Sequence, residues 1–263
     1  LWKAFGSVSS GNFNECGNGL SGRTYGLPRF SKCSFKAEFP FARVSLSDIS
    51  MPVAAELTGW SPFIPGAADD SSLPVAAVEY RFTNRTSRYV KAVFSFHAAN
   101  LMKIGDAAEV KAMEGGFVFH QPPLDKQPEA EGSFAAFTDD PETMVDAAWF
   151  RGGWFDALTM VWNHVAAGDC VSRPPHSEGG AGNGGSIYVP FKLGPRAEKT
   201  IRLQLAWFVP KSAVKAGSTK PAQCGDGCSC GGTDSAAQFY TPWYAAHFKD
   251  IEAVADYWRK NYR

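Results

Sequence analysis

Hydrophobic and polar residues alternate through most of this 263-residue chain, with the period of half-buried β-strands. Between residues 74 and 84, Tyr80 and Phe82 fall on one face and Glu79 on the other. Clusters of Gly, Pro and Asp separate the alternating stretches and supply turn chemistry. The stretches are residues 38–46, 74–84, 89–98, 107–113, 116–120, 133–138, 186–193 and 199–209. The pattern predicts an all-β fold, a large antiparallel β-sandwich.

The strand phases also predict pairing and burial. Residues 84–88 have the length of a hairpin loop, so we expect the strands on either side of them to pair antiparallel. In the first clear strand, residues 38–46, Phe39 and Phe41 are expected to pack in a core. The later residues expected to be buried are Val78, Tyr80, Phe82, Phe94, Phe96, Leu203, Leu205 and Trp207.

The hydrophobic period changes near the C-terminus. Apolar residues there recur at spacings of three and four, as on one face of an amphipathic helix, and Thr241-Pro242 suits the start of a helix. These residues are Tyr244, Phe248, Ile251, Ala255, Trp258 and Tyr262. We predict one convincing helix in the chain and divide it into a β-sandwich, residues 1–240, and a helix, residues 241–263. The apolar face of this helix needs cover, either from the sandwich or from a neighbouring molecule.

Aromatic residues make up 14% of the chain and crowd between residues 143 and 165. The crowd consists of Trp149, Phe150, Trp154, Phe155 and Trp162. Such a cluster is typical of a core layer or a domain interface, but it also suits a platform on which sugar rings stack. Both interpretations stay open, although core packing is the commoner use of aromatic residues.

Charge excludes one class of partner. Lys plus Arg and Asp plus Glu both number 26, so the formal charge is zero, and no basic stripe is present to follow a phosphate backbone. We therefore expect no nucleic-acid partner. No apolar run reaches the length of about 18 residues that a membrane-spanning helix needs, so we expect no transmembrane segment.

The chain contains six cysteines, an even number that is compatible with disulfides in an oxidising compartment or with free thiols. Cys16 and Cys33 bracket a loop that a disulfide could close. Cys224, Cys228 and Cys230 lack the paired spacing of a zinc knuckle, so we expect no metal. The compartment stays open, with a secreted or periplasmic location slightly favoured over a cytoplasmic one. In a secretory route, residues 84–86 would also form a glycosylation sequon.

No catalytic constellation stands out. The G-x-S-x-G and H-E-x-x-H motifs are absent, and no Lys-Ser or Lys-Thr pair follows the glycine-rich residues 179–185. Asp139 and Asp140 precede a proline and are typical of a turn rather than a calcium site. His97 is expected to be solvated or hydrogen-bonded rather than catalytic. The sequence thus predicts no catalytic residue, no cofactor and no metal ligand in this chain.

A series of motifs nevertheless points to a family. Residues 61–65 read S-P-F-I-P and are followed by Asp70-Ser71, by Pro74-Val75 and by a hydrophobic strand that ends at Asn84. Further on come F-H-A-A-N at residues 96–100, W-F-x-G-G at residues 149–153 and L-A-W-F-V-P at residues 205–210. In content and order this series resembles the N-terminal domain of glycoside hydrolase family 116, the family of bile-acid β-glucosidase (non-lysosomal glucosylceramidase). The resemblance covers nearly the whole chain.

The resemblance implies a division of labour. In that family a carboxylate pair hydrolyses glycosidic bonds, and the pair lies in a C-terminal (α/α) toroid catalytic domain of the same polypeptide. We therefore expect this chain to be the N-terminal β-sandwich that supports such a domain and shapes its cleft for a carbohydrate or glycoside, and to be inactive alone. Two alternatives stay open, a free-standing carbohydrate-binding module and an enzyme complete in itself.

The loop after residue 60 supplies the candidate site. Trp60, Phe63, Asp69 and Asp70 are candidates for the domain interface or the substrate rim, because prolines stiffen the loop and aromatic side chains anchor interfaces. The alternative is that this loop only caps its own sandwich. The sequence does not decide between the two.

Overall fold

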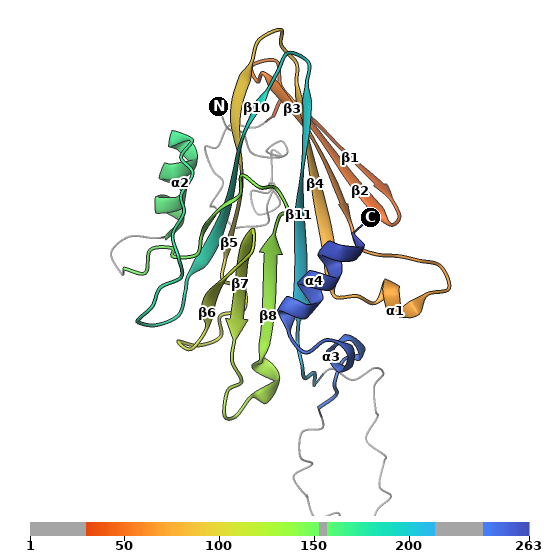
Figure 1. The fold of residues 1–263 in the computed structure, drawn as a ribbon, viewed down its shortest axis with the longest axis vertical. Coiled ribbons are helices and arrows are strands. Elements are labelled where there is room, and N and C mark those ends of the chain that lie inside the picture. The colour runs from red at the N-terminus through yellow and green to blue at the C-terminus, as the bar shows by residue number, and fades with distance from the viewer. Residues whose placement is uncertain (1–29, 153–156, 214–238, 263) are drawn as a thin grey trace, which may run out of the picture.

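In the computed structural model, which describes residues 30–152, 157–213 and 239–262, two antiparallel sheets face each other (Figure 1). The larger, eight-stranded sheet runs β1 (Lys32–Glu38), β2 (Phe41–Ser47), β3 (Val53–Trp60), β4 (Val75–Asn84), β11 (Glu198–Phe208), β8 (Gly132–Phe137), β7 (Gly116–Gln121), β6 (Glu109–Met113). The smaller, three-stranded sheet has the order β5 (Val90–Ala99), β10 (Gly184–Leu193), β9 (Met144–Asp146). The predicted β-sandwich is confirmed.

The described helices are short. They are α1 (Ala68–Ser71), the 3-10 helix η2 (Pro128–Ala130), α2 (Ala157–Ala167), α3 (Trp243–His247) and α4 (Ile251–Asn261). The prediction of a single helix was wrong, because α2 occupies part of the aromatic segment, for which no helix was predicted. None of the described helices is long and apolar enough to span a membrane.

The main core lies between the sheets. It is built from alternate residues of the facing strands: Tyr80, Phe82, Phe94, Phe117, Phe119, Ile187, Val189, Phe191, Ile201 and Leu203. Among the residues predicted to be buried, Phe94 and Leu203 are buried, while Trp207 is 38% exposed. Trp207 lies on the predicted face of β11, next to the last residue of the strand. It is exposed there because the three strands of the smaller sheet cannot cover the whole face of the eight-stranded sheet.

The predicted hairpin between residues 74–84 and 89–98 was wrong. Strand β4 pairs with β3 and β11, whereas β5 pairs with β10, so the connection at residues 84–88 crosses from one sheet to the other. Asn84 is fully buried and holds this crossing: its Nδ2 donates to the carbonyls of Arg88 (2.7 Å) and Gly194 (2.8 Å). Its Oδ1 accepts from the Thr86 amide at 2.9 Å. Because its amide is buried and bonded, Asn84 is not a glycan acceptor in the folded domain.

A second core lies on the outer face of the larger sheet. Val75 and Ala77 of β4 and Ala206 of β11 pack there against Val254 and Trp258 of α4. The sandwich therefore provides the cover that the C-terminal apolar face needs. The single helix predicted there is instead two, because Asp250 caps a new helix by accepting a hydrogen bond from the Ala253 amide at 2.8 Å.

The β1–β2 hairpin replaces the single strand predicted at residues 38–46. Among the described residues, Cys33 and Cys170 carry free thiols, and no group of His, Cys, Asp or Glu could hold a metal. Cys16, the cysteines at positions 224, 228 and 230, and Trp154 and Phe155 lie outside the described residues.

Replacing Asn84 with Ala should lower the free energy of unfolding by about 2–3 kcal/mol, since it leaves two buried carbonyls without their donor. Urea unfolding followed by tryptophan fluorescence measures this change. Asn261→Ala is the control: this amide is exposed on α4 and its loss should cost less than about 0.5 kcal/mol. Equal effects of the two changes would contradict the role given to Asn84.

Candidate functional site

Exposed aromatic side chains gather at one edge of the larger sheet. Phe39 is 79% exposed and Phe63 is 48% exposed, and their rings meet edge to face with centroids 4.7 Å apart. We call this surface the aromatic edge; it consists of Phe39, Phe41, Phe63 and Ile64. All seven residues of β1 are exposed, and the β1–β2 hairpin extends away from the body of the sandwich (Figure 1). A hairpin with so much exposed apolar area is typical of a surface that another body covers.

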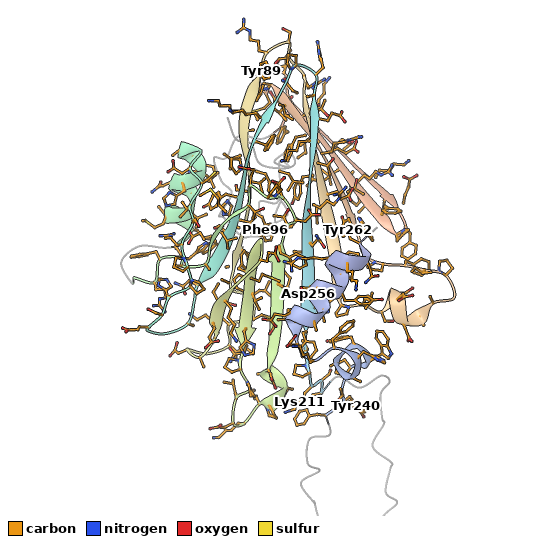
Figure 2. All side chains as sticks on the ribbon, viewed as in Figure 1. Tyr89, Phe96, Lys211, Tyr240, Asp256 and Tyr262 are labelled. Carbon is orange, nitrogen blue, oxygen red and sulfur yellow. The ribbon has the colours of Figure 1, made fainter. Side chains whose placement is uncertain are left out.

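Trp60 connects the aromatic edge to the second core. It is half-buried, and its ring centroid lies 5.3 Å from those of Trp258 and Tyr262. On its other side lies the exposed ring of Phe41, with centroids 6.3 Å apart. Tyr262, at the end of α4 (Figure 2), donates a hydrogen bond from its hydroxyl to Glu79 of β4 at 2.9 Å. Trp60 thus packs within its own domain.

The other predicted site residues lie on the loop after β3. A hydroxyl inside the loop fixes its shape: Ser71 Oγ accepts from the Ile64 amide (2.9 Å) and donates to the Ala67 carbonyl (2.7 Å). Asp69 and Asp70 are exposed in the first turn of α1. The structure therefore brings Phe63 to the aromatic edge and Trp60 to α4, and it leaves the two aspartates on the surface.

A buried polar network lies on the side of the smaller sheet that faces away from the main core. His97 Nδ1 lies 2.8 Å from Ser186 Oγ and its Nε2 lies 2.9 Å from Ser95 Oγ. Trp149 Nε1 donates to the same Ser186 Oγ at 2.8 Å. Burial lowers the pKa of His97 to about 4, and the charge of Asp146 offsets this only in part. His97 is therefore a neutral, hydrogen-bonded histidine, as predicted, and Trp149 is a core residue rather than an exposed sugar platform.

The carboxylate beside this network, that of Asp146, already accepts hydrogen bonds from other groups. Asp146 is fully buried, and its Oδ1 accepts from Arg173 Nε at 2.9 Å and from the Ala148 amide at 3.0 Å. The bond to Asp146 raises the pKa of Arg173. A charge pair held in this way fixes the segment around residue 173 against β9 rather than supplying a base.

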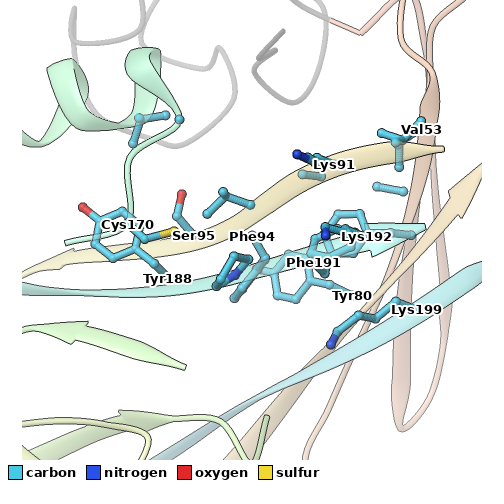
Figure 3. Close-up of a pocket in the computed structure, with 18 of the residues that line it drawn as sticks. Val53, Tyr80, Lys91, Phe94, Ser95, Cys170, Tyr188, Phe191, Lys192 and Lys199 are labelled. Atoms are coloured by element: carbon cyan, nitrogen blue, oxygen red, sulfur yellow. The ribbon is translucent and has the colours of Figure 1, made fainter. Parts of the chain in front are cut away.

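A groove of about 1180 Å³ runs along the edge strand β5 (Figure 3). Its walls are mainly apolar, with Tyr80, Phe94 and Phe191 on the core side, while Lys91 and Lys192 lie at its rim. Among the described residues that line it, the acidic ones are Glu142 and Asp169. Asp169 lies 3.3 Å from His164 Nδ1 at the surface. The groove does not present the facing carboxyl pair that glycoside hydrolysis uses.

The family is decided by a comparison with known sequences. A family model described as "beta-glucosidase 2, glycosyl-hydrolase family 116 N-term" matches residues 7–263. The chain belongs to this family. A search of curated proteins found no match.

The motifs that suggested family 116 have structural roles in this fold. The S-P-F-I-P segment forms the loop next to the aromatic edge, and L-A-W-F-V-P ends β11. Asn100, which closes F-H-A-A-N, donates to the Gly182 carbonyl at 3.0 Å and accepts from the Met102 amide at 3.1 Å. Asn84 and Asn100 thus fix the chain on either side of β5, one before the strand and one after it.

The sequence-based prediction missed three residues of the aromatic edge in this family 116 domain. Phe39 and Phe41 were expected in a core, and Ile64 was not named as a site residue. Alternation cannot distinguish an apolar face that its own domain covers from one that another body covers. Pro40 between two phenylalanines was the available signal, because it indicates a tight turn rather than a continuous strand.

Trp60→Ala should lower the free energy of unfolding of the isolated domain by about 2–3 kcal/mol, because it removes ring contacts with α4. Phe63→Ala, on the exposed side of the same loop, should change it by less than about 0.5 kcal/mol. Thermal and urea unfolding distinguish the two. A stable Trp60→Ala domain would show that this side chain serves something other than its own fold.

His97 should make stability depend on pH. Its folded pKa, about 4, lies below the ordinary 6.5, so the unfolded state binds the proton more readily, and stability should fall as pH decreases from about 6.5 towards 4. The loss should approach about 3 kcal/mol relative to His97→Gln, which cannot titrate there. Urea unfolding across this pH range would refute the assignment if His97→Gln and wild type were parallel.

Proposed function

We propose that this chain is the N-terminal β-sandwich domain of a β-glucosidase-like glycoside hydrolase. It docks through its aromatic edge onto a helical catalytic domain of the same polypeptide and borders the cleft of that domain. The observation that supports this best is the β1–β2 hairpin, which exposes Phe39 and Phe41 at the sheet edge. Covering one such phenylalanine fully gains about 2 kcal/mol, so leaving both in water is costly.

The position of the aromatic edge supports docking of a domain that continues the chain. Tyr262, the last described residue, packs on Trp60, and Trp60 contacts Phe41. A following segment would therefore start beside the exposed rings. The loop with Pro62 and Pro65 is stiff and loses little entropy when it is covered. Asp69 and Asp70 are exposed on the same loop and available for hydrogen bonds across the seam.

The geometry favours this function over a free-standing carbohydrate-binding module. Sugar rings stack on open aromatic faces, whereas the rings of Phe39 and Phe63 are inclined at 72° to each other. Edge-to-face packing of this kind suits an apolar interface that side chains from another domain fill.

The test uses the full-length polypeptide with both domains. The double change Phe39→Ser and Phe63→Ser should lower activity on an aryl β-glucoside at least tenfold, or separate the thermal transitions of the two domains, because interface anchors carry most of the docking energy. The control is Leu101→Ser with Ile104→Ser, which removes two exposed apolar side chains elsewhere. The isolated 263-residue chain should show no turnover.

Two outcomes would contradict the proposal. Turnover by the isolated chain, abolished by changing one of its own carboxylates, would make it an enzyme complete in itself. Glycan binding by the isolated chain that the Phe39→Ser and Phe63→Ser variant loses would make the aromatic edge a carbohydrate-binding surface.

A further inference from the structure

Basic side chains gather at one end of the sandwich, where two connections between its sheets lie side by side. The connection from β4 to β5 carries Arg85 and Arg88, and the one from β10 to β11 carries Arg196. Lys91 and Lys192 face each other as register partners just inside these connections. We call this surface the basic tip; it consists of Arg85, Arg88, Lys91, Lys192 and Arg196, all of which are exposed.

In the part of the chain that the structure describes, no carboxylate neutralises the cations of the basic tip. Among the described residues, none of their side chains lies within ion-pair distance of a carboxylate. The nearby acids have other partners: Glu198 accepts from Thr83 Oγ1 at 2.9 Å, and buried Asp48 accepts from the Ser31 and Ser50 amides. Like charges directly opposite each other, such as Lys91 and Lys192, repel and destabilise a sheet. In a chain of zero formal charge, this local excess suits an anionic partner.

Two large apolar side chains protrude among these cations. Tyr89 is 80% exposed and lies at one extreme of the long axis (Figure 2). Ile49 is 102% exposed on the turn between β2 and β3. The Arg85 amide donates to the Pro52 carbonyl at 2.8 Å, which holds that turn against the basic tip. The surface is therefore a projecting end with apolar and basic side chains, and two of its residues, Lys91 and Lys192, also lie at the rim of the groove along β5.

The backbone of the tip is fixed in this arrangement. Asn84 joins the two connections, as described above, and Arg196 Nη1 donates to the Arg85 carbonyl at 2.7 Å. Arg196 has a φ of 60°, in the left-handed region that glycine occupies without strain. An arginine at such a position costs free energy that the fold must offset elsewhere, which is typical of functional sites.

We propose that the basic tip docks on an anionic lipid surface. Lysine and arginine attract the phosphates of anionic headgroups, while tyrosine and isoleucine side chains enter the boundary beneath them. The tip combines exposed apolar side chains with basic ones, the combination that an anionic headgroup region binds. A nucleic acid would bind the cations, but Ile49 would gain nothing from it.

The test measures flotation of the 263-residue chain with vesicles of phosphatidylcholine, with and without phosphatidylglycerol. Binding should require phosphatidylglycerol and disappear at high salt, because the attraction of the cations is screened. Each cation near an anionic surface should contribute about fivefold to partitioning. The double change Arg85→Ser and Arg88→Ser should therefore weaken binding about 25-fold, and it leaves every backbone hydrogen bond of the tip in place.

The matched control is Lys126→Ser with Lys211→Ser. It removes the same net charge from exposed residues away from the tip, Lys211 lying at the opposite end of the molecule (Figure 2). It should keep wild-type binding. A second variant, Ile49→Ser with Tyr89→Ser, should weaken binding while the remaining affinity stays salt-sensitive, and far-UV circular dichroism checks that each variant is folded.

The inference is overturned if the chain binds neither vesicle, if both arginine and control variants lose binding equally, or if it binds an anionic polymer such as heparin but not vesicles. It does not depend on the docking function proposed above. The Phe39→Ser and Phe63→Ser variant should float with vesicles like the wild type, so a failure of domain docking and a failure of lipid binding are distinguishable.

Discussion

Burial of both faces of β4 and β11 is the constraint on which the rest of the structure depends. On the inner face Phe82 and Leu203 meet the smaller sheet, and on the outer face Val75 and Ala206 meet α4. Neither face is stable in water. The outer face is therefore covered by α4, which follows β11 in the chain and packs back over β4 and β11. This return brings Trp258 and Tyr262 to Trp60 and sets where the chain ends relative to the aromatic edge.

From that second core, burial decreases stepwise towards the aromatic edge. Trp258 is buried, Trp60 is half-buried, Phe41 is exposed and Phe39 is more exposed still. Trp258 contacts Trp60 and Trp60 contacts Phe41, so the ring of Phe41 rests on a fixed base. Side chains held in this way lose little conformational entropy when they are covered, which is what a docking surface requires.

Local patterns gave the strands of this fold but not their partners. Alternation located β4, β5, β10 and β11 correctly, because one face of each strand meets the main core. It could not distinguish a hairpin at residues 84–88 from a crossing between sheets, since both need two strands and a short loop. The deciding group was the buried amide of Asn84, whose acceptors include Gly194, more than a hundred residues away. Long-range hydrogen bonds of this kind leave no period in a sequence.

The candidate site is subject to the same limit, because local patterns do not show which distant segments a residue will contact. Phe63 could be singled out because prolines around an aromatic side chain have a local meaning, and Trp60 could be singled out for the same reason. What the sequence could not show is that β3 places Trp60 under α4, while the loop turns Phe63 outwards to Phe39. Burial of two aromatic residues three positions apart depends on segments distant in the chain.

Strand β3 also relates the two ends of the molecule. It begins at Val53, beside the basic tip, and ends at Trp60, beside the aromatic edge. From its first to its last residue, an extended strand of this length spans about 23 Å. Because both ends belong to one hydrogen-bonded sheet, this separation is fixed by backbone geometry and does not depend on loops.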